Sequence, residues 1–285
     1  MQRNLMTEPM KSIQLQDGRQ LGWREWGPQD GKPVVFCTGA GMSGSLGFGE
    51  EHLDQLGLRL IAPHRPGCAN SSIHPEKSLQ SWAHDVAELL SHEKLPACHV
   101  VGFSMGVPFA MALHETCTVE SMAIVAGQDQ FDYPETYNLL PDDVKAMLAQ
   151  RRSSPSEFEQ WIAGNANADW LWSFIMSGSS ELDKAVYSET DFAKAYRHCL
   201  AEGFAQGGNS YARDLVNAWG EWSVTPEEVN CPVVLWFGAQ DRSSVHSPDG
   251  GALLQQRFAH ARRNFLDHAG GSILWTHARE ILQAL

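Results

Sequence analysis

Short apolar runs recur along this chain of 285 residues, and segments with helical periodicity separate them. Runs of this length, bounded by turn residues, suit strands that are buried on both faces of a parallel sheet. Alternating strands and helices predict an α/β fold, with a mostly parallel central sheet and helices on both of its faces. The expected strands span residues 33–38, 58–63, 97–104, 121–127, 231–238 and 262–267, and the expected helices lie at 78–93, 107–115, 252–260 and 277–285.

Two segments depart from this alternation. Residues 11–26 alternate loosely around Asp17-Gly18, which predicts a β-hairpin. Between about 129 and 226 the sequence is helical, so we predict a core of residues 1–128 and 227–285 and a helical lid at 129–226. Tryptophans in this lid either pack its own core or line an apolar substrate cavity between lid and sheet. They are Trp161, Trp170, Trp172, Trp219 and Trp222.

Composition excludes several classes of function. A net charge of −13 argues against a nucleic-acid partner, because binding to phosphates needs a basic surface. The N-terminus has no signal-like apolar region and no stretch is long enough to span a membrane, so we expect a cytoplasmic protein without a membrane partner. The six cysteines are scattered without a C-x-x-C pair, which predicts free thiols rather than disulfides or a zinc site.

The segment Gly102-Phe103-Ser104-Met105-Gly106 is a G-x-S-x-G motif that follows an expected strand and opens an expected helix. In that context the serine sits on a tight turn, where side chains two residues to either side would clash. The turn lifts the Ser104 hydroxyl above the sheet edge, close to a helix N-terminus whose free amides stabilise developing negative charge. The motif therefore predicts a serine nucleophile.

A rival motif lies earlier in the chain. Gly39, Gly41 and Gly44 form a G-x-G-x-x-G pattern after the first apolar run, as in dinucleotide-binding proteins. That function needs an acidic residue after the next strand to hold the ribose, and the strand at 58–63 is followed by His64-Arg65 instead. We therefore do not expect a nucleotide cofactor.

With these motifs in place, the chain outside the lid resembles the α/β-hydrolase superfamily. Residues 34–45 stand where that family has its oxyanion loop, with Thr38 in place of the usual histidine, and residues 60–72 resemble another family segment, with His64 at its usual aspartate. Residues 235–244 resemble the strand end that supplies the catalytic acid. The resemblance implies that Ser104 is the nucleophile, Asp241 the acid, and the amides of Ala40 and Met105 the oxyanion hole, without a metal or organic cofactor.

The histidine base is the missing part of this pattern. The family commonly places it in a turn after the last strand, and in the segment FLDHAGGSIL that position is Gly271. His268 falls three residues early and is the alternative base, whereas His277 falls six residues late and is expected to begin the last helix after an N-cap at Thr276. Other loop histidines are weaker candidates, namely His64, His74 and His246.

Two functions remain open on this basis. The resemblance implies a serine hydrolase for a small, fairly apolar ester, lactone or related acyl substrate, impaired or inactive because Gly271 cannot accept a proton. The alternative is a ligand-binding pseudo-hydrolase that uses the pocket for sensing or regulation. The glycine at 271 fits a deliberately inactivated variant or a natural pseudo-enzyme. In both cases the partner is a small molecule, and the sequence leaves the oligomeric state open.

Overall fold

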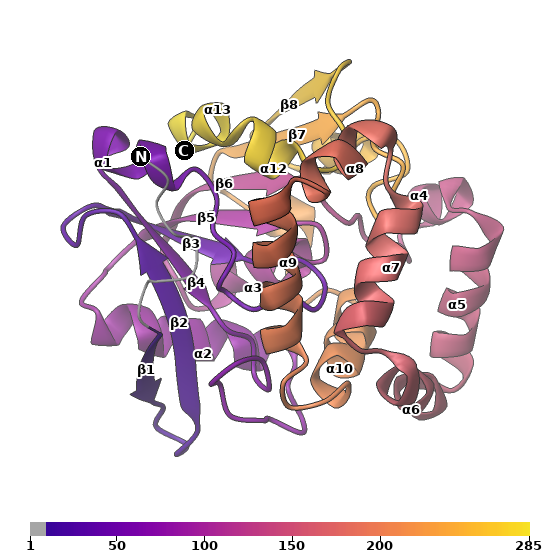
Figure 1. Cartoon of the computed structure of the whole chain (residues 1–285), viewed down its shortest axis with the longest axis horizontal. Helices are drawn as coiled ribbons and strands as arrows, with labels where there is room; N and C mark the ends of the chain where they lie inside the picture. Colours follow the sequence, from indigo (N-terminus) through magenta and orange to yellow (C-terminus); the bar gives the residue numbers. More distant parts are fainter. Residues whose placement is uncertain (1–9) are drawn as a thin grey trace.

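The computed structural model describes residues 10–285 and contains an eight-stranded sheet with the order β1-β2-β4-β3-β5-β6-β7-β8 (Figure 1). Strands β3 to β8 are parallel, whereas β2 runs antiparallel to β4 and β1 antiparallel to β2. The mostly parallel sheet expected from the apolar runs is thus confirmed. The strands are β1 (Lys11–Gln14), β2 (Gln20–Trp26), β3 (Lys32–Cys37), β4 (Leu58–Pro63), β5 (Cys98–Phe103), β6 (Val119–Val125), β7 (Val233–Gly238) and β8 (Ala261–Leu266).

Burial along the strands explains their sequences. Every residue of β4, β5 and β7 is buried, as expected for continuous apolar runs between two helical layers. The edge strand β8 keeps its side chains partly exposed and accordingly carries Arg262 and Arg263. Strands β1 and β2 form the expected hairpin, and Gly18 in its turn has a φ of 87°.

Helices that connect the strands cover both faces of the sheet. Helices α2 and α3 pack against each other, and α1 lies against α13 near the C-terminus in Figure 1. The expected helix at 78–93 is α2, whose N-cap Ser78 exchanges hydrogen bonds with Ser81 in a capping box. These helices are α1 (Glu50–Leu56), α2 (Leu79–His92), α3 (Gly106–Ala112), α11 (Ala252–Arg257), α12 (Ile273–Thr276) and α13 (Ala278–Gln283), with short 3-10 turns at η1 (Leu113–Glu115) and η2 (Pro226–Glu228).

Seven further helices stand between β6 and β7, and we call them the helical insertion. In Figure 1 they gather on the right-hand side of the sheet. Their apolar side chains belong to the same continuous core as the central strands, so the insertion is packed onto the sheet rather than tethered to it. They are α4 (Pro134–Leu139), α5 (Asp142–Ser153), α6 (Pro155–Asn165), α7 (Ala168–Gly178), α8 (Glu181–Tyr187), α9 (Thr190–Gly203) and α10 (Asn209–Ala218).

Two further expectations can be compared with the structure. All six cysteines are free and five of them are buried, as predicted. Across residues 10–285, none of the helices has both the length and the apolar character that crossing a bilayer demands.

Candidate active site

Ser104 lies on a sharp turn between β5 and α3. Its φ of 52° places it in the left-handed region, which is strained for a residue with a side chain. Hydrogen bonds hold this conformation: the Ser104 amide donates to Val125 O at 3.2 Å, and Gln128 N donates to Ser104 O at 3.0 Å. The neighbouring strand β6 therefore fixes the turn that presents the serine.

Both glycines of the motif are required by close packing. A Cβ at Gly106 would lie 2.1 Å from Cys37 O, and a Cβ at Gly102 would lie 3.0 Å from the Cβ of Ala110. The crowding expected from the sequence therefore exists on both sides of Ser104: it is a severe overlap with the end of β3 at Gly106 and a tight contact with α3 at Gly102.

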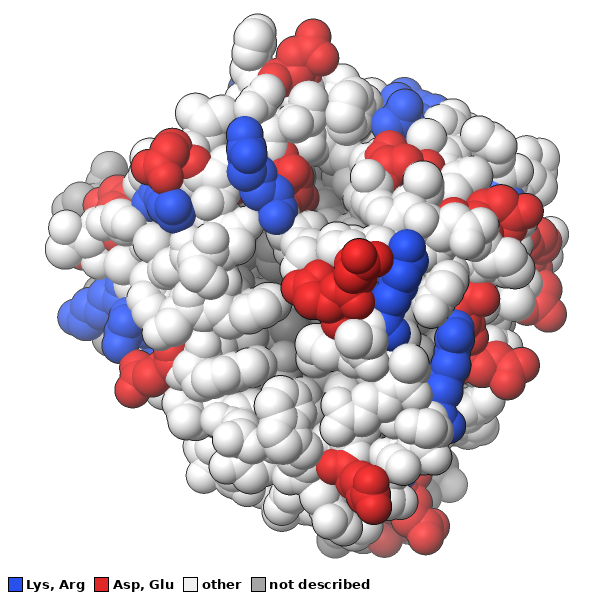
Figure 2. Space-filling view, turned by 90° about the vertical axis from the view of Figure 1, so that its right-hand side faces the viewer, with Lys and Arg blue, Asp and Glu red and all other residues white. Residues whose placement is uncertain are grey.

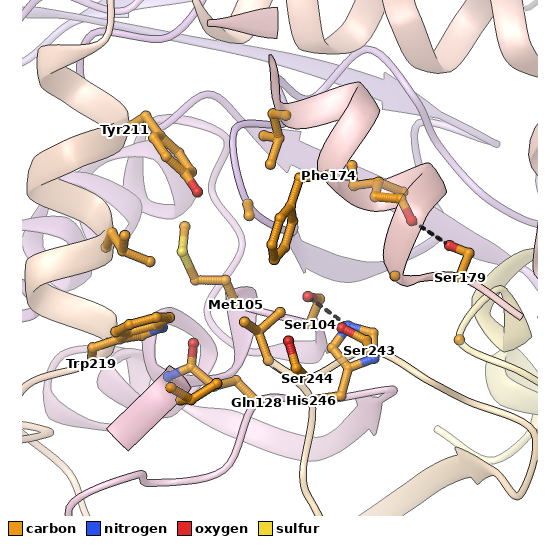
Figure 3. A pocket seen from close by; sticks show the side chains of 18 of the residues that line it. Ser104, Met105, Gln128, Phe174, Ser179, Tyr211, Trp219, Ser243, Ser244 and His246 are labelled. Carbon is orange, nitrogen blue, oxygen red and sulfur yellow. Dashed lines mark hydrogen bonds between the residues drawn. The ribbon is translucent and has the colours of Figure 1, made fainter. Parts of the chain in front are cut away.

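A histidine contacts Ser104, and it is His246. Its Nε2 lies 2.9 Å from Ser104 Oγ (Figure 3), and its Nδ1 lies 2.7 Å from Asp241 Oδ2. Asp241 and His246 both belong to the loop after β7, where His246 follows the carboxylate by five residues. The structure thus brings together the expected nucleophile and acid with a histidine that was only a weaker candidate in the sequence.

The proton positions follow from the partners of His246. Burial opposes the ionisation of Asp241, but the His246 imidazole and the backbone amides of Ser243 and Arg242 outweigh it and hold the pKa of Asp241 below its usual value. An ionised carboxylate accepts hydrogen bonds only, so Nδ1 of His246 carries the proton. Its Nε2 is then free to accept the Ser104 hydroxyl proton, which is the arrangement that general-base activation of a serine needs.

The His246 loop is anchored through the next residue, Ser247. Its amide donates to Gly127 O at 2.8 Å, and its hydroxyl oxygen lies 3.2 Å from Asp129 Oδ2 and 3.0 Å from Asp249 Oδ1. Asp129 is fully buried, and burial raises its pKa to about 6. The segment after β6 therefore holds the loop that carries His246 in place through these contacts to Ser247.

The turn at Gly271, where the family spacing predicts the histidine, binds a carboxylate instead. The Gly271 amide donates to Asp183 Oδ2 at 3.0 Å and the Ser272 amide to Asp183 Oδ1 at 2.8 Å, so a carboxylate from α8 binds this turn. A Cβ at position 271 would lie 3.0 Å from Asp241 Oδ1. The turn thus reaches the acid as expected, but Asp241 is already bonded to His246.

The two histidines near Gly271 lie outside the cavity. His268, the alternative base expected from the sequence, is exposed and is not among the residues that line the cavity containing Ser104. His277 is the N-cap of α13, whereas Thr276 ends α12, so the expected N-cap was one residue early. The sequence also led us to expect that no histidine reaches Ser104. The contact between His246 and Ser104 contradicts that expectation.

The sequence did contain a signal for His246. It stands five residues after Asp241 in a loop at the carboxyl end of a parallel strand, the same sheet edge at which Ser104 is presented. Parallel strands bring such loops together. The usual family spacing instead predicts the histidine in the turn after β8.

Comparison with known proteins shows the family of this chain. The sequence model of the Alpha/beta hydrolase family matches residues 34–284, which is most of the chain. The chain belongs to the α/β-hydrolase family. Over 112 residues it is also 33% identical to a Variovorax paradoxus protein named as the carbamate hydrolase RutD, an alignment that covers 37% of this chain and 41% of that protein.

Solved structures resemble this α/β-hydrolase over nearly its whole length. A hydrolase from Pseudomonas aeruginosa has a TM-score of 0.69 at 17% identity, covering 96% of this chain and 97% of its own. The enol-lactonase of Burkholderia xenovorans has a TM-score of 0.66 at 18% identity, with the same coverage. At these identities the likeness describes the fold.

Two residues of the α/β-hydrolase that line the cavity beside Ser104 are Ala40 and Met105, the residues expected to supply oxyanion-hole amides. Within residues 10–285 neither amide donates a hydrogen bond. Arg65 holds the loop that carries Ala40, because its guanidinium donates to Thr38 O at 2.7 Å and to Gly39 O at 2.8 Å. Arg65 also donates to Asp214 of α10 at 2.9 Å, which links this loop to the helical insertion.

The cavity above Ser104 has a volume of about 250 Å³ and lies between the sheet edge and the insertion. Its lining is mainly apolar, with Met105, Leu171, Phe174 and Ile175 among the side chains that face it. Figure 2 looks onto the side of the molecule where the insertion lies, and this face is hollowed near its middle between mostly uncharged side chains. Such a cavity suits a small apolar ligand.

The tryptophans of the insertion divide between the two expected roles. Trp161, Trp170 and Trp219 line the cavity. Trp172 and Trp222 do not, and Trp222 is buried in the core. Among the described residues, no three or more His, Cys, Asp or Glu side chains are grouped so as to hold a metal ion.

Proposed function

We propose that this α/β-hydrolase is an active serine hydrolase in which His246 is the catalytic base. The observation that carries the proposal is the hydrogen-bonded chain from Ser104 Oγ through His246 to Asp241 Oδ2, at 2.9 and 2.7 Å. These distances lie within the range over which a proton can be transferred to a general base. The chain order Ser, Asp, His is that of the family, although the histidine comes from a different loop.

The proposed mechanism uses groups that already face one another. Ser104 Oγ attacks the acyl carbon while its proton passes to His246 Nε2, and Asp241 stabilises the imidazolium that forms. The unbonded amides of Ala40 and Met105 bind the oxyanion. His246 then protonates the leaving group and deprotonates the water that attacks the acyl-enzyme.

The substrate class follows from the cavity. A volume of about 250 Å³ with a mainly apolar lining fits a small, fairly apolar ester, lactone or related acyl compound. The names of similar proteins, a carbamate hydrolase, esterases and an enol-lactonase, are compatible with acyl chemistry of this kind. The alternative of a ligand-binding pseudo-hydrolase was supported by Gly271, and the His246 contact weakens that support.

The test compares single variants in hydrolysis of short-chain p-nitrophenyl esters. We expect His246→Ala and Ser104→Ala each to lower kcat by at least about 10³-fold, because loss of either leaves only binding and the oxyanion hole. Labelling of Ser104 by a fluorophosphonate should fail in both variants.

His268→Ala is the matched control, since this exposed histidine should be dispensable. A wild-type chain that neither labels nor turns over any ester overturns the proposal in favour of the pseudo-hydrolase. Full activity of His246→Ala, or its loss in His268→Ala, shows that another residue is the base.

A further inference from the structure

Gln128 brings a carboxamide side chain into the mainly apolar lining of the cavity. It follows β6 and is 1% exposed. Its backbone amide donates to Ser104 O at 3.0 Å, so the position of Gln128 is tied directly to the nucleophile turn. An amide in such a place is costly unless both of its polar atoms have partners.

The orientation of the Gln128 amide is fixed by α10. Its Nε2 donates to Ala218 O at 2.7 Å, and this carbonyl also accepts a bond from Trp222 Nε1 at 3.0 Å. A carbonyl only accepts, so the NH₂ group must face Ala218 and the amide cannot be flipped. The oxygen Oε1 is therefore directed away from α10.

The Gln128 oxygen faces the cavity without a partner. Within residues 10–285, no donor bonds to Oε1, although the atom is not sealed off from the cavity. Figure 3 shows it turned toward the space between Trp219 and Met105. Neither of these side chains offers it a hydrogen bond in the structure, so the acceptor is available to a ligand.

The place of Gln128 relative to His246 indicates which part of a substrate it would contact. His246 must protonate the leaving group, so the leaving group lies on its side of Ser104. In Figure 3, Gln128, Trp219 and Met105 lie on the other side of Ser104 from His246. The space beside Gln128 is therefore the space for the acyl group.

We propose that the acyl group of the substrate carries a hydrogen-bond donor, an N–H or O–H group, which Gln128 Oε1 accepts. The substrate class narrows from a small apolar acyl compound to one whose acyl chain bears a secondary amide, amine or hydroxyl group. This inference rests on the proposed function. A ligand without the donor would leave a buried acceptor unsatisfied, which typically lowers reactivity by about 10–100-fold.

The test uses matched pairs of p-nitrophenyl esters. One member of each pair has an acyl chain containing a secondary amide, and in the other member a methylene group replaces the N–H of that amide. The pairs differ from one another in the distance between the amide and the ester carbonyl. We expect the wild-type chain to prefer the N–H member of at least one pair by about 10–100-fold in kcat/KM. In Gln128→Met that ratio should fall to within about threefold of one.

The ratio is measured within each variant, so a general loss of activity cancels. Gln130→Met is the matched control, because Gln130 lies outside the cavity and bonds to Arg257, and it should keep the wild-type ratio. Should Gln128→Met not fold, Gln128→Asn withdraws the amide by one methylene group and should also reduce the ratio.

Two results overturn the inference alone: no preference in any pair, or a preference that survives in Gln128→Met. Failure of the proposed function is distinguishable from these, because neither member of any pair would then be hydrolysed in a Ser104-dependent way. That outcome overturns both proposals.

Discussion

Asp241 shows at the scale of a single residue why the position of the histidine matters. One carboxylate oxygen accepts from His246 and the other from the Ser243 amide, so both oxygens already have partners. Gly271 approaches the same carboxylate from the opposite turn, and a Cβ there would lie 3.0 Å from Oδ1. Gly271 therefore keeps the turn close to Asp241 without competing for it.

We predict that Gly271→His does not raise ester hydrolysis and lowers kcat/KM by a few fold or more. A second imidazole beside Asp241 would compete with His246 for the carboxylate that orients it. The measurement is kcat/KM for p-nitrophenyl acetate. Gly271→Ala, which adds the Cβ without the imidazole, separates crowding from competition. A gain of orders of magnitude in Gly271→His would show instead that His246 does not serve Ser104.

Arg65 connects three elements around the loop after β3, which carries Ala40 and which we propose contributes to the oxyanion hole. Its guanidinium bonds to two carbonyls after β3 and to Asp214 of α10, and it stacks on Phe109 of α3 at 4.8 Å. Lys77 contacts the other oxygen of Asp214 at 2.8 Å. The fork of an arginine can make all of these bonds at once, whereas the ammonium group of a lysine cannot.

For Arg65→Lys we expect kcat for a short ester to fall by about 10–100-fold, with KM changed by only a few fold. The loop would keep a positive charge near Asp214 but would lose the paired bonds that aim the Ala40 amide, and one misplaced oxyanion donor costs about 10²-fold or more. Steady-state kinetics give the split between kcat and KM. Arg213→Lys is the control. Arg213 lies on α10 next to Asp214 but bonds to Glu159, so this change should leave kcat nearly unaltered. Equal losses in both variants, or a change confined to KM, would refute the positioning role.

At the scale of the whole molecule, Asp129 makes stability depend on pH. The single hydroxyl proton of Ser247 serves the carboxylates of Asp129 and Asp249, and burial raises the pKa of Asp129 to about 6. An unfolded aspartate titrates near pH 4, so between about pH 4 and 6 the folded chain holds this proton more tightly than the unfolded chain. The contribution of Asp129 to stability is therefore present at low pH and is lost as the pH rises through about 6, by up to about 3 kcal/mol.

Asp129→Asn should remove this dependence, because its amide imitates the protonated carboxyl group. The free energy of unfolding of the variant relative to wild type should shift in favour of the variant by about 1–3 kcal/mol between pH 4.5 and 7.5. Urea denaturation at the two pH values measures the difference. Asp249→Asn, beside the same hydroxyl, is the matched control and should show a smaller shift, because Asp249 is only partly buried whereas Asp129 is fully buried. A constant difference across this range would mean that Asp129 ionises normally.

Local patterns in the sequence predict the sheet, the connecting helices and the turn at Ser104: apolar runs, helical periodicity, and two glycines whose missing side chains let β5 turn sharply into α3. The family resemblance adds Asp241 as the candidate acid. Which histidine contacts Ser104 depends instead on tertiary contacts. His246 reaches Ser104 because Ser247 is bonded to Gly127 and Asp129, which are more than a hundred residues away in the chain. Contacts between residues so far apart produce no periodic pattern in the sequence. The usual family spacing placed the histidine at Gly271 and therefore predicted that the base is absent.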